Sequence, residues 1–293
     1  MARILNIGSL NLDYVYAVPH FVAPGETLCA ASRQVFAGGK GLNQTVAAAR
    51  AGAKVYHAGA VGPDGDRLLK LLEEAGADTS AVEWADVPTG HAIIQVSPQG
   101  ENAIIILGGA NRSISREALD RALDIAEEGD ILLLQNEING LDYIIPQAAR
   151  RGLRILFNPA PMDESVKNLP LGLIDTLVVN EGEGQALAGD MEALKAAYPK
   201  QNILLTQGSR GATLFAGGET VFQPAFRVKA LDTTAAGDCF LGYYAAALSE
   251  GLPYGRALLL ATAASALAVQ KQGAAPSIPC RAEVEAFAQA NSR

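Results

Sequence analysis

The sequence predicts an α/β fold in which a doubly wound, mostly parallel sheet is flanked by helices. Short apolar runs recur along the 293 residues, helical patterns lie between them, and a glycine follows several of these patterns. A continuous apolar run is typical of a parallel strand that helices cover on both faces, and a glycine suits the end of a helix. Because the elements alternate, we expect the ligand site at the carboxyl ends of the strands.

The elements follow in order from these patterns. The predicted strands are Ile4–Ile7, Val55–Val61, 131–134, 155–157, 177–179 and 203–205. The predicted helices are residues 42–51, 67–75 and 116–126, which end before Gly52, Gly76 and Gly129.

Two segments, residues 12–36 and 89–107, interrupt the alternation. Both resemble hairpins, with strands that include residues 27–35 and turns at Pro24-Gly25 and residues 98–100. Neither segment is long enough to form its own core. We therefore expect them to combine into one small sheet that covers the site as a lid, within a single domain of residues 1–293.

Composition excludes several classes of function. A net charge of -8 disfavours binding to nucleic acid or anionic lipid, which both require a basic surface. Cys29, Cys239 and Cys280 are far apart, which suits a reducing cytoplasm rather than a disulfide framework or a zinc site. The N-terminus lacks a signal-peptide pattern, and residues 257–269, the longest apolar segment, are too short to span a membrane.

The strongest local motif is residues 232–238, DTTAAGD, which lead into an amphipathic helical pattern. A glycine-containing turn at a helix start leaves backbone N–H groups free beside the positive end of the helix dipole, which suits a phosphate in transfer. Asp238 would lie next to this anion site. The alternative is an ordinary N-cap by Thr233 or Thr234.

A second motif, residues 38–44 with the sequence GGKGLNQ, places glycines at the opening of a helix. Glycine lets the backbone approach a ligand closely, and the amides of Asn43 and Gln44 suit sugar hydroxyls. The spacing matches neither a Walker A loop nor a GxGxxG fingerprint. A simple turn is the alternative.

Further polar residues follow predicted strands. Asp13, in Asn11-Leu12-Asp13, would accept hydrogen bonds from a polyol, although an Asx-turn is the commoner use of such residues. Residues 180–183 (NEGE) and 206–211 (TQGSRG) fall on the same rim of the sheet. Glu183 would hold Mg²⁺ through water, or would simply be a solvated residue of a first helical turn.

Taken in order, these motifs resemble the ribokinase branch of the PfkB carbohydrate-kinase family, from about Gly8 to the C-terminus. The resemblance depends on residues 38–44, on residues 59–65 (GAVGPDG) and on residues 232–238. It implies a ribokinase-like fold, and ATP, Mg²⁺ and K⁺ as cofactors. It also implies a homodimer in which the two lids clasp each other.

The resemblance assigns roles residue by residue. Asp238 would be the catalytic base, beside an anion hole formed by Ala235, Ala236 and Gly237. The sugar would be bound by Asn11, Asp13, Gly39, Lys40, Asn43, Glu137 and Asp238. The nucleotide would be bound by Asn180, Glu183, Thr206, Gly208, Ser209, Gly211 and Gly237, and Glu183 would also hold magnesium through water. The monovalent cation would be held by Asp232, Thr234, Ala268, Lys271, Gly273 and Ser277.

Some positions bear on the identity of the sugar. Asn136 stands where the family usually carries an apolar residue, and Gly108-Gly109 stands where one glycine is commonly a proline. Asn11 favours ribose, because the related deoxyribokinases carry methionine at this place. We therefore expect ATP-dependent phosphorylation of the primary 5-hydroxyl of D-ribose. A family kinase for another sugar or a nucleoside, and a non-catalytic sugar-binding protein, remain the alternatives.

Overall fold

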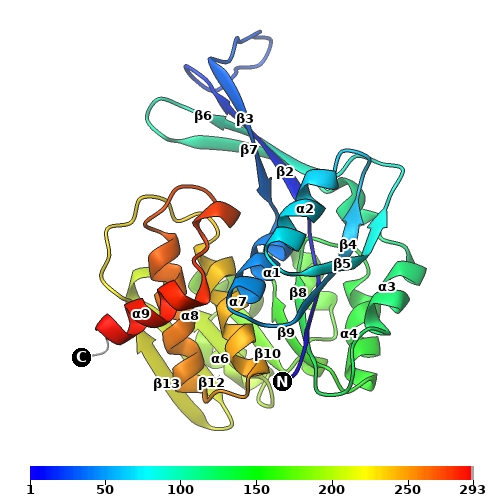
Figure 1. The fold of residues 1–293 in the computed structure, drawn as a ribbon, viewed down its shortest axis with the longest axis vertical. Coiled ribbons are helices and arrows are strands. Elements are labelled where there is room, and N and C mark those ends of the chain that lie inside the picture. Colours follow the sequence, from blue (N-terminus) through cyan, green and yellow to red (C-terminus); the bar gives the residue numbers. More distant parts are fainter. Residues whose placement is uncertain (292–293) are drawn as a thin grey trace.

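The computed structural model describes residues 1–291, and within that range the strands form two sheets (Figure 1). The large sheet has the order β13-β12-β11-β10-β9-β8-β1-β4-β5, and the small sheet has the order β3-β2-β6-β7. Parallel pairing runs from β5 to β11, and β12 and β13 add an antiparallel edge. The predicted α/β fold class is confirmed.

The elements have the following bounds. The large sheet contains β1 (Ile4–Ile7), β4 (Val55–Val61), β5 (Asp78–Trp84), β8 (Ile131–Gln135), β9 (Arg154–Asn158), β10 (Thr176–Asn180), β11 (Asn202–Thr206), β12 (Gly211–Ala216) and β13 (Glu219–Pro224). The small sheet contains β2 (Asn11–Ala17), β3 (Ser32–Gly38), β6 (Gly90–Val96) and β7 (Asn102–Leu107). The helices are α1 (Lys40–Arg50), α2 (Asp66–Glu74), α3 (Arg116–Leu123), α4 (Leu141–Arg150), α5 (Glu181–Ala188), α6 (Met191–Ala197), α7 (Ala236–Ser249), α8 (Tyr254–Ala268) and α9 (Arg281–Asn291), with short 3-10 turns between several of them.

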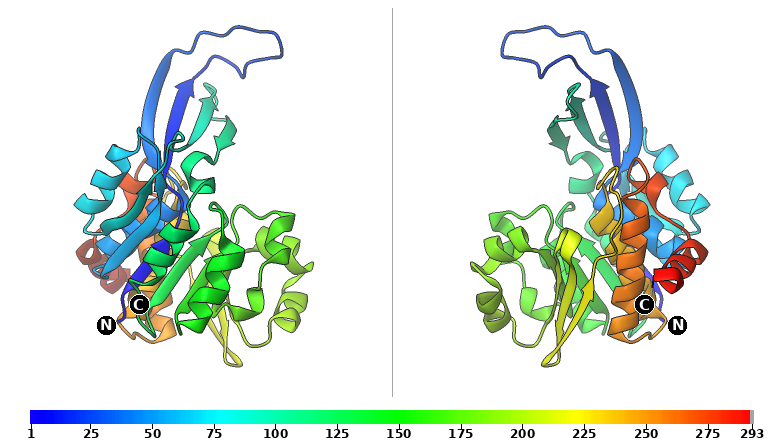
Figure 2. Two further views of the ribbon diagram at one scale, coloured as in Figure 1. Left: turned by 90° about the vertical axis from the view of Figure 1, so that its right-hand side faces the viewer. Right: turned by 90° about the vertical axis from the view of Figure 1, so that its left-hand side faces the viewer.

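Helices cover both faces of the large sheet. Helices α1, α2, α7, α8 and α9 pack on one face, and α3 to α6 pack on the other (Figures 1 and 2). Side chains of each strand alternate between these layers, so that Leu177 joins one cluster and Val178 the other. This double cover explains why the six predicted strands have continuous apolar runs, and each of them is confirmed to within one residue.

The order of the strands reverses at β1, which pairs in parallel with both β4 and β8. From β1 the chain builds the sheet outwards through β4 and β5, and then returns to build the other half from β8 to β11. Connections that leave neighbouring strands in opposite directions open a crevice at the carboxyl ends of those strands. The segments that follow β1 and β8 therefore meet at this point.

Helix α7 differs from the prediction. The sequence predicts an amphipathic helix, but every residue from Asp238 to Ser249 is buried, because α1 and α8 pack along its sides. Gly242 permits this approach: a Cβ at this position would lie only 2.5 Å from the carbonyl oxygen of Gln44 on α1. The close contact brings the first turn of α7 against the first turns of α1.

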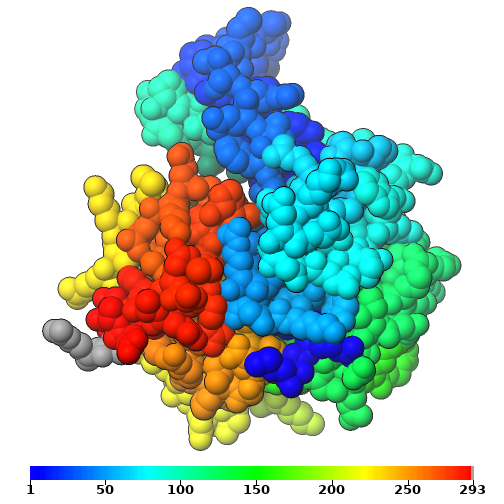
Figure 3. Space-filling view, viewed as in Figure 1, coloured from blue at the N-terminus to red at the C-terminus, as the bar shows by residue number. Residues whose placement is uncertain are grey.

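The small sheet is built from the two segments that interrupt the alternation. Strands β2 and β3 pair antiparallel, as do β6 and β7, and a parallel β2–β6 pairing joins the two halves. The predicted strand at residues 27–35 is only partly correct, since β3 begins at Ser32 and the mostly exposed residues 19–31 continue beyond the end of the paired strands. The small sheet projects from one end of the protein (Figures 2 and 3).

Helix α3 is shorter than predicted, because residues 124–126 turn away from the helix before Gly129. Within residues 1–291, no helix combines the length and the apolar character needed to cross a bilayer.

Candidate active site

The loop after β1 and the end of β8 meet at the opening of α1. The Lys40 backbone N–H donates to Oε2 of Glu137 over 3.0 Å, and the Ser9 hydroxyl donates to the same oxygen. The Gly41 N–H donates in turn to the Ser9 hydroxyl over 3.2 Å. Glu137, predicted to bind the sugar, is thus placed so that it satisfies free N–H groups at the start of α1. Ser9 was not predicted, because the dipeptide Gly8-Ser9 matches no motif.

Asn11 lies at the start of β2 with its side chain held by Asn111. Nδ2 of Asn111 donates to Oδ1 of Asn11 over 2.7 Å, and the Asn111 side chain also bonds to the backbone N–H and carbonyl of Leu10. These contacts leave the Asn11 amide nitrogen directed away from Asn111. The role of Asn111 was not predicted, because nothing in the sequence indicates that it lies next to Asn11.

Asp13 lies two residues further along β2, beside the backbone of Gly38. A Cβ at Gly38 would collide with the Asp13 carboxylate, so glycine is what makes room for it. Burial raises the pKa of Asp13 to about 6, and the negative charge of Glu137 contributes in the same direction. Asp13 and Glu137 therefore belong to one partly buried cluster of carboxylates.

Asp238 is the third residue of α7, within its first turn, and is 8% exposed. Its oxygen Oδ1 accepts a hydrogen bond from Nε2 of Gln44 over 3.0 Å, and Oδ2 accepts one from Nδ2 of Asn43 over 3.2 Å. Burial raises the pKa of Asp238; Lys40 and the two amide donors oppose this shift, whereas Glu137 adds to it. Asn43, predicted to contact the sugar, also contacts this carboxylate.

Lys40 faces the same carboxylates. Burial alone would lower its pKa, but the negative charges of Asp238, Glu137 and Glu183 outweigh that effect and raise the pKa. Lys40 therefore stays protonated at neutral pH. Gly39, the N-cap of α1, has φ of 96°, a conformation that places the Lys40 backbone next to Glu137 and that favours glycine.

The turn before α7 carries the predicted anion hole. Ala235, at φ of 57°, is the one residue other than glycine with a positive φ in the described part of the chain, and such a conformation costs about 1–2 kcal/mol for an L-residue. The Ala236 N–H donates to the Thr233 carbonyl over 3.2 Å. The N–H groups of Ala235 and Gly237 donate to no acceptor within residues 1–291, so two of the three predicted donors remain available.

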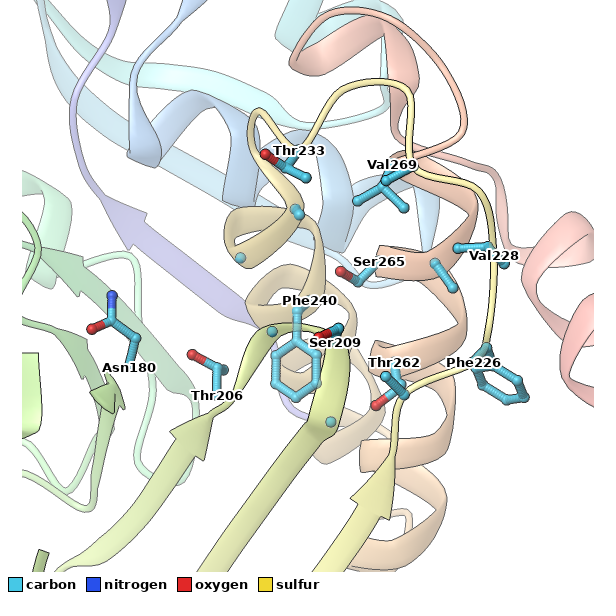
Figure 4. A pocket seen from close by; sticks show the side chains of 17 residues that line it. Asn180, Thr206, Ser209, Phe226, Val228, Thr233, Phe240, Thr262, Ser265 and Val269 are labelled. Carbon is cyan, nitrogen blue, oxygen red and sulfur yellow. The ribbon is translucent and has the colours of Figure 1, made fainter. Parts of the chain in front are cut away.

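A cavity of about 400 Å³ opens between β11, β12, α7 and α8. Figure 4 shows Phe240 standing between Thr206 on one side and Thr262 on the other. The lining includes six of the residues predicted for the nucleotide: Asn180, Thr206, Gly208, Ser209, Gly211 and Gly237. The structure adds residues that no motif indicated, because they come from α8 and from the irregular segment after β13: Phe226, Val228, Thr262, Ser265 and Val269.

A second cavity of about 180 Å³ lies between the first one and Asp238. Its lining includes Lys40, Glu183 and residues 235–238, and it shares Asn180 and Thr233 with the larger cavity. The two cavities therefore adjoin at the start of α7, and the smaller one is lined by Asp238.

Asn180 and Glu183 form a capping box at the start of α5. The Glu183 N–H donates to Oδ1 of Asn180, and the Asn180 N–H donates to Oε2 of Glu183, both over 2.8 Å. Residues 1–291 contain no group of three or more potential metal ligands from His, Cys, Asp and Glu. Mg²⁺ commonly uses one or two carboxylates together with substrate phosphates, so the donor set fits this ion once a nucleotide is present.

The predicted cation loop is brought together in part. The Asp232 carboxylate accepts hydrogen bonds from the Thr234 N–H and hydroxyl and from the Gly273 N–H, at 2.9, 2.6 and 2.8 Å. Ala268 and Lys271 share a turn at the end of α8. The Ser277 hydroxyl bonds to the Ala274 carbonyl. The carboxylate, hydroxyl and carbonyl oxygens of these two loops are ligands that hard cations prefer.

Known proteins resemble the chain over its whole length. The pfkB family carbohydrate kinase profile matches residues 1–281. The ribokinase of Haemophilus influenzae is 36% identical over 296 residues, which cover 96% of each protein. The crystal structure of a Thermotoga maritima ribokinase has a TM-score of 0.88 at 38% identity, and covers 99% of this chain and 100% of that one. An Arabidopsis thaliana ribokinase complexed with ribose and ATP has a TM-score of 0.88 at 31% identity, and covers 98% of this chain and 99% of that one. The chain therefore belongs to the pfkB family of carbohydrate kinases.

Proposed function

We propose that this protein is a ribokinase, which transfers the γ-phosphoryl group of ATP to the primary 5-hydroxyl of D-ribose. The observation that carries the proposal is the position of Asp238. Asp238 lines the smaller cavity, which adjoins the apolar one, and its carboxylate accepts a hydrogen bond from Asn43. The negative charge of Glu137 also acts on this carboxylate. The relatives named as ribokinases, one of them with ribose and ATP bound, support the same assignment.

Asp238 serves as the base in this proposal. Phosphoryl transfer asks the protein mainly to position the reactants and to stabilise charge, while a carboxylate accepts the proton of the attacking hydroxyl. A raised pKa makes the ionised Asp238 a stronger base, and its two amide donors keep the carboxylate in one orientation. The sugar hydroxyls bind to Asn11, Asp13 and Asn43. Gly39 and Lys40 at the start of α1, together with Glu137 after β8, complete the sugar site.

The nucleotide lies in the cavity of about 400 Å³, with its base against apolar residues such as Phe240 and Val228. Its phosphates extend towards Lys40 and the N–H groups of Ala235 and Gly237, which stabilise the charge on the transferred group. Glu183 would hold magnesium through water, and this ion would neutralise charge at the phosphates. The loops of Asp232 and Gly273 would hold potassium, which would support the arrangement of the chain before α7.

A coupled ADP-release assay tests this proposal. Mg-ATP is supplied with ribose, deoxyribose, arabinose, fructose, fructose 6-phosphate, adenosine or uridine, each in potassium and in sodium. We expect turnover on ribose that potassium stimulates. Faster turnover on another acceptor would assign the protein a different substrate within the family. No turnover on any of the seven acceptors would favour a non-catalytic protein.

We also propose that two copies associate through their small sheets. Among residues 1–291, strand β7 has no neighbour on its outer side, and its residues Ile104, Ile105, Ile106 and Leu107 are each at least 50% exposed. Apolar residues of this kind on an edge strand favour association, because they leave water when another surface covers them. A second copy of the same chain provides a matching surface under twofold symmetry.

Replacing Ile104 and Ile106 together by glutamate is expected to convert a dimer into a monomer. The two side chains point to the same face of the small sheet as Asp13, as the strand register shows. Light scattering at micromolar concentration measures the mass. Leu173→Glu, which alters an exposed apolar residue outside the small sheet, should leave the dimer intact. A monomeric unmodified protein would refute the association.

A further inference from the structure

A row of polar side chains from neighbouring strands of the large sheet is buried beneath helices, in a layer that is otherwise apolar. Asn6 on β1 pairs with His57 on β4, and Gln135 ends the neighbouring strand β8. All three side chains are fully buried, on the face of the large sheet that α1 and α7 cover. Buried polar groups carry a cost unless they are hydrogen-bonded, so this row requires an explanation that packing alone does not provide.

The row is hydrogen-bonded to Asp238. Gln44 donates from Nε2 to the carboxylate, and its own Oε1 accepts from Nε2 of Gln135 over 2.7 Å. The same nitrogen of Gln135 donates to Oδ1 of Asn6 over 3.1 Å. Nδ2 of Asn6 donates to the Gly41 carbonyl and to the Thr45 hydroxyl, both over 2.9 Å.

These bonds have only one consistent direction. A backbone carbonyl can only accept, so the carbonyl of Gly41 requires the amide nitrogen of Asn6 and turns its oxygen towards Gln135. Gln135 must then present its nitrogen both to Asn6 and to Gln44. Gln44 therefore presents its oxygen to Gln135 and its nitrogen to Asp238. This series of hydrogen bonds ends at Nε2 of Gln44, a donor that requires an acceptor oxygen on Asp238.

We infer that Asn6, Gln135 and Gln44 form an amide relay whose function is to hold the Asp238 carboxylate in position as an ionised hydrogen-bond acceptor. This inference rests on the proposed function, in which Asp238 is the base. The three amides are positioning residues: all are fully buried, and only Gln44 bonds to Asp238 itself. At the far end, Thr45 bonds to Nδ1 of His57 over 2.7 Å, and burial lowers the pKa of His57 to about 3, so no positive charge enters the relay.

The charged groups around Asp238 have opposing effects on the ionisation of its carboxylate. Lys40 on α1 favours the ionised carboxylate, and Glu137 after β8 opposes it. The negative charge of Glu183 on α5 contributes to the raised pKa of Lys40, and the charge of Glu137 contributes to the raised pKa of Asp13 on β2. The buried thiol of Cys239, the next residue on α7, stays neutral because burial and the Asp238 charge raise its pKa. The donor of Gln44 adds a neutral group that favours ionisation without introducing another charge.

Gln44→Met tests the relay, because methionine has a similar length and shape but donates no hydrogen bond. We expect the pKa of Asp238 to rise by about one unit, since a donor to the charged form is lost. The pKa is measured by ¹³C NMR of aspartate carboxyls, with the Asp238 signal assigned from Asp238→Asn. In the ribose assay, the acid limb of the kcat profile should move to higher pH by the same amount, while KM for the sugar changes little.

Gln135→Met supplies the second test, since Gln135 does not touch Asp238. It should raise the Asp238 pKa by a smaller amount in the unmodified background, and should have no further effect on that pKa when Gln44→Met is already present. Equal effects in both backgrounds would overturn the relay. Tyr243→Phe is the matched control: it removes a buried hydrogen bond to the Pro279 carbonyl from the same helix and should lower Tm without moving either the pKa or the acid limb.

The NMR measurement separates the relay from the proposed function. If the unmodified protein fails to phosphorylate ribose but Gln44→Met still raises the Asp238 pKa, the relay stands and the substrate is wrong. If ribose is phosphorylated and both methionine variants lower Tm without moving the pKa, the buried amides serve stability alone and the relay is refuted.

Discussion

Asp238→Asn is expected to fold and to bind both substrates, with kcat lowered by about 10³-fold, within the range that general base catalysis contributes. Asparagine has nearly the same shape but cannot accept the proton of the attacking hydroxyl. In the unmodified protein, Gln44 and Asn43 each bond to one carboxylate oxygen of Asp238. Asparagine keeps one acceptor oxygen, which can bond to one of the two. Steady-state kinetics with Mg-ATP and ribose measure kcat, and calorimetry measures ribose binding.

Asp190→Asn provides the control for this change. Asp190 caps α6 by accepting a hydrogen bond from the Ala193 N–H, and asparagine performs the same capping role. The control should keep full activity. Near-normal kcat in Asp238→Asn would remove Asp238 from the role of base and would favour another acceptor for the proton.

Asp13→Asn is expected to make the protein more stable and less active. The pKa of Asp13 is raised from 3.8 to about 6 in the folded protein, so the neutral form is favoured by folding. The stabilising contribution of the neutral carboxyl is complete below pH 3.8 and is lost as the pH rises through 6. At pH 8 the ionised side chain therefore costs about 2 kcal/mol of stability, allowing for its partial exposure.

Asparagine at position 13 is neutral, so it removes the stability cost of the ionised carboxylate. The same change weakens sugar binding. We expect the free energy of unfolding to increase by about 2 kcal/mol at pH 8 and to be unchanged near pH 3.5. We expect kcat/KM for ribose to fall by about 10²-fold, because hydrogen bonds from sugar hydroxyls to a charged acceptor contribute about 1.5–3 kcal/mol each. Urea unfolding at the two pH values and steady-state kinetics measure these changes.

Asp64→Asn is the control of opposite sign. Burial is the largest single effect on the pKa of Asp64 and raises it, but hydrogen bonds from the Thr89 side chain and backbone, with smaller contributions, together lower this pKa below its usual value. Its ionised form is favoured by folding, so this variant should lose stability at pH 8. If Asp13→Asn also lost stability at pH 8, burial of the charged Asp13 would not be the cost that we assign to it.

Local sequence determined six adjacent strands of the large sheet, from β11 to β4, and the location of the two glycine-rich helix starts. Apolar runs covered on both faces, such as Ile4–Ile7, are visible in one window of the chain because their periodicity is local. The edge strands β5 and β13 were not predicted, since they are partly exposed and mix polar with apolar residues. The mostly buried strand β12, which begins at Gly211, was also not predicted. Polar side chains at strand ends likewise indicated the rim of the sheet.

Partners far apart in sequence were decided only by the tertiary structure. Glu137 meets Ser9 because β1 and β8 are neighbours, and Asp238 meets Gln44 because Gly242 lets α7 lie against α1. One side of the apolar cavity comes from α8 and from the chain after β13, where no motif marks a ligand site. A short motif specifies the chemistry that a residue offers, but only packing across the sheet specifies the groups that face it and therefore its pKa and its orientation.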